Sequence, residues 1–196
     1  MSNRRLERTR RLATSIRSCA GEPLKRNVGL LSSLMESKKI VESSIDRFAE
    51  AAERYCVWSE GELNNSQEDM RRARLLLAEI HLAAVQLPDL GIGKNIDAVS
   101  MPHDEWSRVY KKFGSLPVKN YSHVFNPLKE EEPVISSLAD DLADIYRDIK
   151  AGLSLFKAQH PIDAACEWRF SFQSHWGRHL VGAQRAIHEY LAEEGF

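Results

Sequence analysis

Apolar residues recur every three or four positions along most of the chain after residue 36, with polar residues between them. This spacing places apolar side chains on one face of an α-helix. Prolines, glycines and helix-capping residues divide the pattern into separate segments. We predict helices at residues 37–58, 66–87, 100–113, 133–157 and 161–194.

The connections between these segments indicate how the helices pack. The last two are joined only by His160 and its neighbours, so we expect them to be antiparallel neighbours. No stretch alternates apolar and polar residues over the length of a strand. The sequence therefore predicts an all-α fold, an antiparallel helical bundle of four long helices plus a short helix.

The N-terminal segment differs in charge from the rest of the chain. The first 34 residues carry eight basic and two acidic residues, whereas the whole chain has a formal net charge of −1. We interpret residues 1–36 as a basic, mobile extension and residues 37–196 as a single helical domain. An arginine-rich segment with few acidic residues is also typical of an organelle transit peptide. Met35 is an alternative start of translation.

Composition excludes several classes of protein. Hydrophobic residues are 43% and charged residues 28%, as in ordinary globular domains, and no apolar run reaches the roughly 18 residues of a membrane span. Cys19, Cys56 and Cys166 form no CxxC pair, which favours a reducing cytoplasm. An acidic domain is a poor electrostatic partner for nucleic acid. Trp58 and Trp106 are the candidate contacts of a homodimer.

Three aspartates share one flank of the predicted helix at 133–157. Asp141, Asp144 and Asp148 are spaced by three, four and seven residues. Like charges at such spacings destabilise a helix by about 0.2–0.5 kcal/mol per pair. Arg147 reaches Asp144, but no basic residue follows any of the three by four positions. We therefore expect the counter-charge to come from another helix or from a bound ion.

The last predicted helix offers partners for these aspartates. Arg169 falls within its apolar face, and an arginine that faces a core needs an acid. His175 and His179, four residues apart, lie at the edge of the same face. Glu167 and Arg178 lie on the adjoining flank. In a helical hairpin these residues and the three aspartates would face each other across a polar interhelical seam.

Three interpretations of this seam remain open. In the first interpretation, the seam is a structural ion network between the aspartates, Arg169 and Arg178. Alternatively, His175 and His179 hold a divalent metal together with carboxylates from the neighbouring helix. In the third interpretation, Arg169 binds the carboxylate or phosphate of a small ligand.

Two motifs of the seam resemble an uncharacterised bacterial family, domain of unknown function 5063. The first motif is Asp140-Asp-Leu-Ala-Asp-Ile-Tyr-Arg-Asp148. The second consists of two segments, Glu167-Trp-Arg-Phe-Ser-Phe and His175-Trp-Gly-Arg-His-Leu. The similarity covers about residues 40 to 192, including the segment at 121–127. It implies a helical fold and a bacterial cytoplasmic setting, and it carries no established activity.

Taken together, these patterns favour a binding or interaction module whose seam is structural or holds a small ligand. The alternative is a metal-dependent, hydrolase-like enzyme. In that hypothesis the two histidines are metal ligands and one aspartate is a general base.

Overall fold

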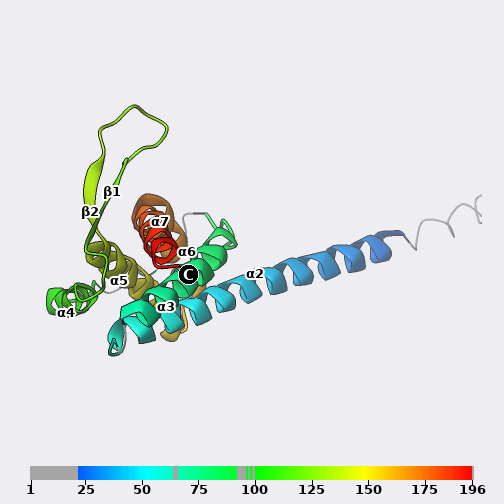
Figure 1. The fold of residues 1–196 in the computed structure, drawn as a ribbon. Coiled ribbons are helices and arrows are strands. Elements are labelled where there is room, and N and C mark those ends of the chain that lie inside the picture. The colour runs from blue at the N-terminus through cyan, green and yellow to red at the C-terminus, as the bar shows by residue number, and fades with distance from the viewer. Residues whose placement is uncertain (1–21, 64–65, 92–95, 97, 99, 196) are drawn as a thin grey trace, which may run out of the picture. The chain divides into compact units, whose positions relative to one another are not determined.

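The computed structural model describes residues 22–63, 66–91, 96, 98 and 100–195 (Figure 1). These residues are mostly helical, which confirms the all-α fold class. The helices are α2 (Glu22–Glu60), α3 (Ser66–Val85), α4 (His103–Phe113), α5 (Leu138–Lys157), α6 (Pro161–Ser171) and α7 (Gly177–Glu193). None of the described helices combines the length and the apolar character that crossing a membrane would need.

The chain divides into two compact units, residues 1–42 and residues 43–196. The described part of the first unit is the beginning of α2, in which residues 32–40 are all exposed. Helix α2 begins at Glu22, earlier than the predicted start at residue 37. Most of the predicted basic extension, residues 1–21, lies outside the described residues.

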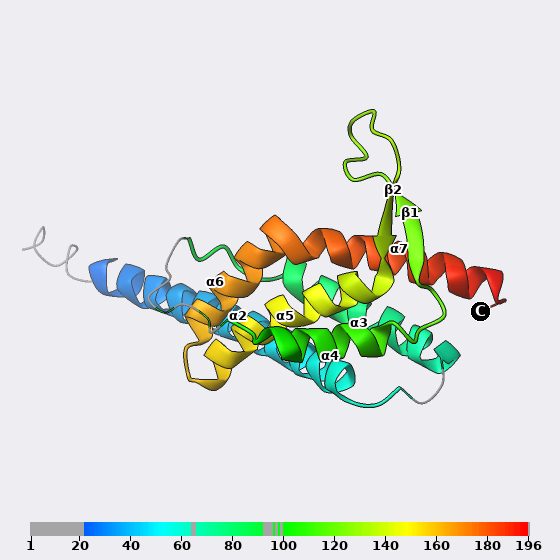
Figure 2. The same cartoon turned by 90° about the vertical axis from the view of Figure 1, so that its left-hand side faces the viewer.

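Helix α5 is the central element of the second unit. It packs against α4, α6 and α7, and α3 packs against α7 (Figure 2). Gly152 of α5 lets α6 approach closely, because a Cβ at this position would collide with the ring of Trp168. The Trp168 indole N–H donates to the Ile149 carbonyl oxygen at 2.9 Å. The last helices are therefore neighbours of α5, as the short connection predicts.

Aromatic side chains fill the core between these helices. The ring centroid of Phe48 on α2 lies 4.5 Å from that of Trp168 and 6.2 Å from that of Trp176. All three are fully buried. Burying a side chain of this size stabilises a fold by about 1.5–3 kcal/mol, so this cluster helps to hold the second-unit part of α2 against the last helices. Trp58, a candidate dimer contact, is also buried, with its ring centroid 4.9 Å from that of Phe113.

A two-stranded antiparallel hairpin, which the sequence did not predict, precedes α5. Strand β1 (Asn120–His123) pairs with β2 (Val134–Ser137), and Asn120 lies opposite Ser137. The predicted helix start at Pro133 is therefore wrong: α5 begins at Leu138, and the Ser137 hydroxyl caps it by accepting the Asp140 N–H. Strands of four residues are too short to show a clear alternation, and such a hairpin depends on packing for its stability.

The predicted long helix at 161–194 is interrupted by one wide turn. Residues 172–176 form a π-helical turn, η1 (Phe172–Trp176), between α6 and α7. Gly177 ends this turn, and its N–H donates to the Phe172 carbonyl oxygen. A Cβ at residue 177 would collide with that same oxygen, so the turn requires glycine here. Single π turns inside α-helices are frequent at functional sites, and His175 lies within this one.

Candidate metal centre

Helix α5 supplies three carboxylates to the region between α5 and α7. Asp141, Asp144 and Asp148 follow one flank of the helix, as their spacing predicts. The side chain of Asp144 is 13% exposed, so most of its carboxylate is withdrawn from water. Burying an ionised carboxylate is costly unless hydrogen bonds or cations compensate. The groups around each carboxylate therefore determine whether its buried charge is compensated.

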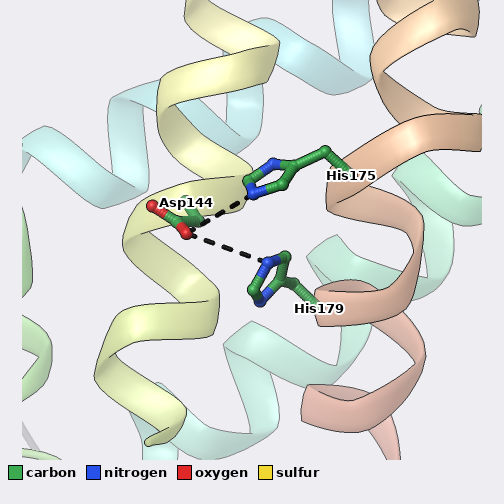
Figure 3. A group of neighbouring side chains, drawn as sticks. All are labelled: Asp144, His175 and His179. Carbon is green, nitrogen blue, oxygen red and sulfur yellow. Dashed lines mark ion pairs between the residues drawn. The ribbon is translucent and has the colours of Figure 1, made fainter. Parts of the chain in front are cut away.

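The two histidines come from the opposite side of this region. His175 extends from η1 and His179 from the first turn of α7. Both rings point toward Asp144, and their centroids are 4.7 Å apart (Figure 3). The wide turn of η1 and the first turn of α7 thus present two imidazoles to a single carboxylate.

Each histidine has one ring nitrogen beside its own aspartate. His175 Nδ1 lies 2.8 Å from Asp148 Oδ2, and His179 Nδ1 lies 2.7 Å from Asp141 Oδ1. An ionised carboxylate can only accept a hydrogen bond, so each Nδ1 carries the hydrogen and donates it. In a neutral imidazole this leaves the lone pair on Nε2.

The two Nε2 atoms converge on one oxygen of Asp144. Each lies 3.8 Å from Asp144 Oδ2. This separation is too long for a hydrogen bond. The three atoms belong to a group of possible metal ligands that all lie within 4.8 Å of one another. Metal bonds of about 2.1 Å at tetrahedral angles place ligand atoms about 3.4 Å apart, so a contraction of a few tenths of an ångström would suit an ion.

The other oxygen of Asp144 is held by two donors. The indole N–H of Trp106, on α4, donates to Asp144 Oδ1 at 3.0 Å. The guanidinium of Arg147 lies 2.9 Å from the same oxygen, and its Nε lies 3.3 Å from Asp148 Oδ1. These contacts fix the plane of the carboxylate and leave Oδ2 turned toward the histidines. Trp106, which the sequence analysis offered as a dimer contact, is half-buried and belongs to this site.

The β hairpin reaches the site through Tyr121. Its hydroxyl donates to Asp141 Oδ2 at 2.7 Å, so Asp141 bridges Tyr121 and His179. Burial, together with this hydrogen bond, raises the pKa of Tyr121 well above its usual value, which keeps the hydroxyl protonated and donating. Gly182 on α7 makes room for it, because a Cβ there would collide with the Tyr121 hydroxyl.

The electrostatics of the site favour a cation. With neutral histidines, three carboxylates and the single guanidinium of Arg147 leave two negative charges. Burial, and then the charges of Asp144 and Asp141, raise the pKa of nearby Asp140. The hydrogen bond to Asp141 raises the pKa of His179, although burial acts in the opposite direction. The shift of His179 favours its protonated form, whereas the shift of Asp140 reflects burial first and neighbouring negative charge second.

A groove of about 1190 Å³ opens beside the histidines. One wall is the β hairpin with its loop, and the other is η1 with α7. His175, His179, Asp140 and Asp141 line it, together with Arg178. The two histidines, though not Asp144, therefore border a space that can admit a small molecule.

The structure brings together five of the eight predicted seam residues and separates the other three. Arg169 does not meet the aspartates of α5: it donates to the Leu87 carbonyl oxygen at 3.0 Å and lies 3.4 Å from Asp89 Oδ2. The Glu167 carbonyl accepts the Ser171 hydroxyl within α6. The Arg178 guanidinium lies 5.2 Å from the centroid of the Phe125 ring. For Glu167 and Arg169 the wide turn at η1 is the reason, because it changes the helical phase between α6 and the histidines relative to an uninterrupted helix.

Two side chains of the site could not be predicted from the sequence. Trp106 and Tyr121 lie far from the aspartates along the chain and have no charge to draw attention to them. The only signal for Tyr121 was its position in the segment at 121–127, which the family resemblance includes. No local pattern could have shown that either side chain reaches α5.

Comparisons with known proteins agree on the fold. No curated protein matches the chain. The crystal structure of protein BF1032 from Bacteroides fragilis, a structural genomics target, is similar, with a TM-score of 0.63 and 21% sequence identity over 75% of this chain and 91% of that one. At this identity the likeness concerns the fold alone. Residues 39–193, which include every residue of the site, match a described family. The chain therefore belongs to the family described as Domain of unknown function (DUF5063).

Proposed function

We propose that this protein binds a divalent transition metal ion through Asp144 Oδ2, His175 Nε2 and His179 Nε2, and that it is a metal-dependent enzyme of the hydrolase type. The observation that carries the proposal is the convergence of two Nε2 atoms on one carboxylate oxygen, each 3.8 Å away. Two imidazoles and one carboxylate are a common ligand set for zinc and for non-haem iron.

The outer contacts support this assignment. Metal-binding histidines almost always donate their other ring N–H to a carboxylate or carbonyl, which fixes the ring and its tautomer. His175 and His179 each do so, to Asp148 and Asp141. The Asp144 carboxylate is itself oriented by Trp106.

A structural ion network is the competing interpretation. Protonated histidines would also balance the two negative charges, and their Nδ1 contacts would be unchanged. However, a proton on each Nε2 would point toward an oxygen too distant to accept it. An ion at the common point satisfies all three atoms.

Three protein ligands leave coordination positions open for water and substrate, as in catalytic metal sites. A bound metal of this kind lowers the pKa of its water and so supplies a hydroxide near neutral pH. Asp140 lines the groove and lacks a histidine partner, so it is the carboxylate best suited to accept a proton. Its raised pKa brings it closer to neutrality, where a general base works best.

The test is metal binding by the purified full chain. After removal of metal with a chelator, we expect wild type to take up one equivalent of Zn²⁺ or Co²⁺ in equilibrium dialysis, with a micromolar or lower Kd. The His175→Ala, His179→Ala double variant should lose this uptake. The His188→Ala variant, which removes an exposed histidine of α7, is the matched control and should bind normally.

Asp144→Asn provides a second variant, whose side chain has nearly the same shape as that of wild type. A loss of metal binding in this variant therefore cannot be attributed to the loss of a side chain. Circular dichroism confirms that each variant is folded. Wild type that takes up no metal at micromolar concentration, or a double variant that binds as well as wild type, would overturn the proposal.

A further inference from the structure

The wall of the groove formed by α7 carries two arginines that the proposed metal ligands do not use. Arg178 and Arg185 are seven residues apart, so they lie on the same side of α7, and both line the groove beside His179. Both are exposed. Neither forms an ion pair with any residue in the described part of the chain.

The environment of Arg178 leaves its hydrogen-bonding edge available. Its guanidinium carbon lies 5.2 Å from the centroid of the Phe125 ring on the hairpin loop. A guanidinium placed against a ring keeps its N–H donors in its own plane. Such an arginine can still bind a carboxylate or phosphate through two parallel hydrogen bonds.

Two of the acidic residues that line the groove are engaged by hydrogen bonds. Asp141 accepts from Tyr121 and His179, and Glu131 accepts the Asn126 N–H. Lys129 and Glu130 are adjacent on the hairpin loop, and Asp140 lines the groove from α5. Arg178 and Arg185 carry the positive charge of the α7 wall, and neither has a counter-ion among the described residues.

The opposite wall is largely apolar. Phe125 and Ile135 on the hairpin are 58% and 71% exposed, and Val134 lies beside them. Val181 on α7 is 54% exposed and faces the same groove. A ligand that fits this space has an anionic group toward α7 and an apolar part toward the hairpin.

We infer that the groove binds an organic oxyanion, a phosphate or a carboxylate attached to an apolar group, through Arg178, Arg185 and the metal ion. This inference rests on the proposed function, because the metal supplies one of the three positive partners. The apolar part packs against the hairpin, and the anionic group lies beside the open coordination positions. Two guanidiniums and a divalent ion suit a group with one or two negative charges.

The test uses the full chain loaded with Co²⁺, whose visible absorption changes when a ligand reaches the metal. Phenylphosphate and benzoate are the probes, since they share a ring and differ in the anion. We expect at least one to bind wild type and to shift the cobalt spectrum. Binding should weaken tenfold or more in the Arg178→Ala, Arg185→Ala double variant, while cobalt content stays the same.

Two further variants keep the result interpretable. Arg72→Ala with Arg108→Ala removes two exposed arginines outside the groove and should leave anion binding unchanged. Arg185→Ala alone removes a groove arginine without disturbing the ring contact of Phe125, and we expect it to weaken binding several-fold.

The outcomes separate the two proposals. Failure of wild type to bind cobalt would overturn the proposed function and this inference together. Cobalt binding with no response to either anion at millimolar concentration, or an equal response in the double variant, would overturn this inference alone. A response to phenylphosphate only, or to benzoate only, supports it and identifies the anion.

Discussion

Each histidine of the candidate metal centre has one ring nitrogen committed to an aspartate. Asp148 takes the Nδ1 hydrogen of His175, and Asp141 takes that of His179. The aspartates thus decide which nitrogen of each ring faces Asp144. Although they do not touch the proposed ion, they set the direction of its ligands.

The first prediction concerns Asp148, which holds the ring of His175. Replacing Asp148 with Ala frees the ring of His175 to rotate, so we expect metal affinity to fall about 10–100-fold. Competition with a chelating dye measures the change. Asp46→Ala, at an exposed position of α2, is the control and should bind as wild type does. Equal affinities in the two variants would show that Asp148 does not orient the ligand.

At the scale of elements, the hairpin and α7 are joined where Tyr121 passes over Gly182. The glycine leaves no room for a Cβ beneath the tyrosine hydroxyl. The hydroxyl in turn bonds to Asp141 of α5. One short contact therefore fixes the hairpin, α5 and α7 together.

The second prediction is a double-mutant cycle on this contact. Gly182→Ala should push Tyr121 away from Asp141 and destabilise the fold, whereas in a Tyr121→Phe background the same change should cost less, because no hydroxyl is in the way. We expect a coupling free energy of about 0.5–3 kcal/mol, measured by urea unfolding. Additive effects of the two substitutions would mean that the contact does not form.

The elements also show what the sequence could and could not reveal. The period of apolar residues was sufficient to place α3, α4 and most of the last two helical segments, because their buried faces span several turns. It failed at Val134 and Ile135, whose apolar character suits a helix face and a strand equally well. It also failed at residues 172–176, because a wide turn leaves no compositional mark except a glycine at its end.

The same limits explain the outcome for the seam. Residues on one helix face, such as Asp141, Asp144 and Asp148, follow directly from their spacing. Whether Arg169 or His175 faces them depends on the phase across η1, which the sequence does not display. Contacts from Trp106 and Tyr121 depend on tertiary packing, and no local pattern encodes them.

At the scale of the whole second unit, a polar cluster away from the groove links α2, α4 and α5. The Tyr146 hydroxyl lies 3.0 Å from Glu60 Oε1 and 2.7 Å from Glu105 Oε1. The Lys150 ammonium also contacts Glu60. Burial acts to raise the pKa of Glu60, but the hydrogen bonds from Lys150 and Tyr146 outweigh it, so the pKa lies below its usual value.

This shift leads to a prediction about acid stability. A carboxyl group whose pKa is lowered by folding stabilises the folded state above its unfolded pKa of about 4.3, and that contribution is lost as pH falls through the folded pKa. Glu60→Gln should therefore lower the free energy of unfolding at pH 7, by up to about 1 kcal/mol since the pair is partly exposed. The difference from wild type should shrink toward zero in acid.

Urea unfolding at neutral and acid pH measures both values. Glu189→Gln, on the exposed face of α7, is the control for removing a negative charge. A deficit in Glu60→Gln that is the same at both pH values would show that the carboxylate charge is not what stabilises this cluster.

The wide turn at η1 has a consequence for how the sequences of the family diverged. A π turn holds one residue more than an α turn, so its simplest origin is the insertion of a single codon into an ancestral regular helix. Deleting one residue between 172 and 176 would restore that helix and leave α7 in nearly the same orientation relative to α6, because the wide turn takes up the extra residue within a single turn. Homologous sequences with a one-residue gap at this place should therefore keep α7 and His179 in position, and only the residues of the turn itself, His175 among them, should change direction.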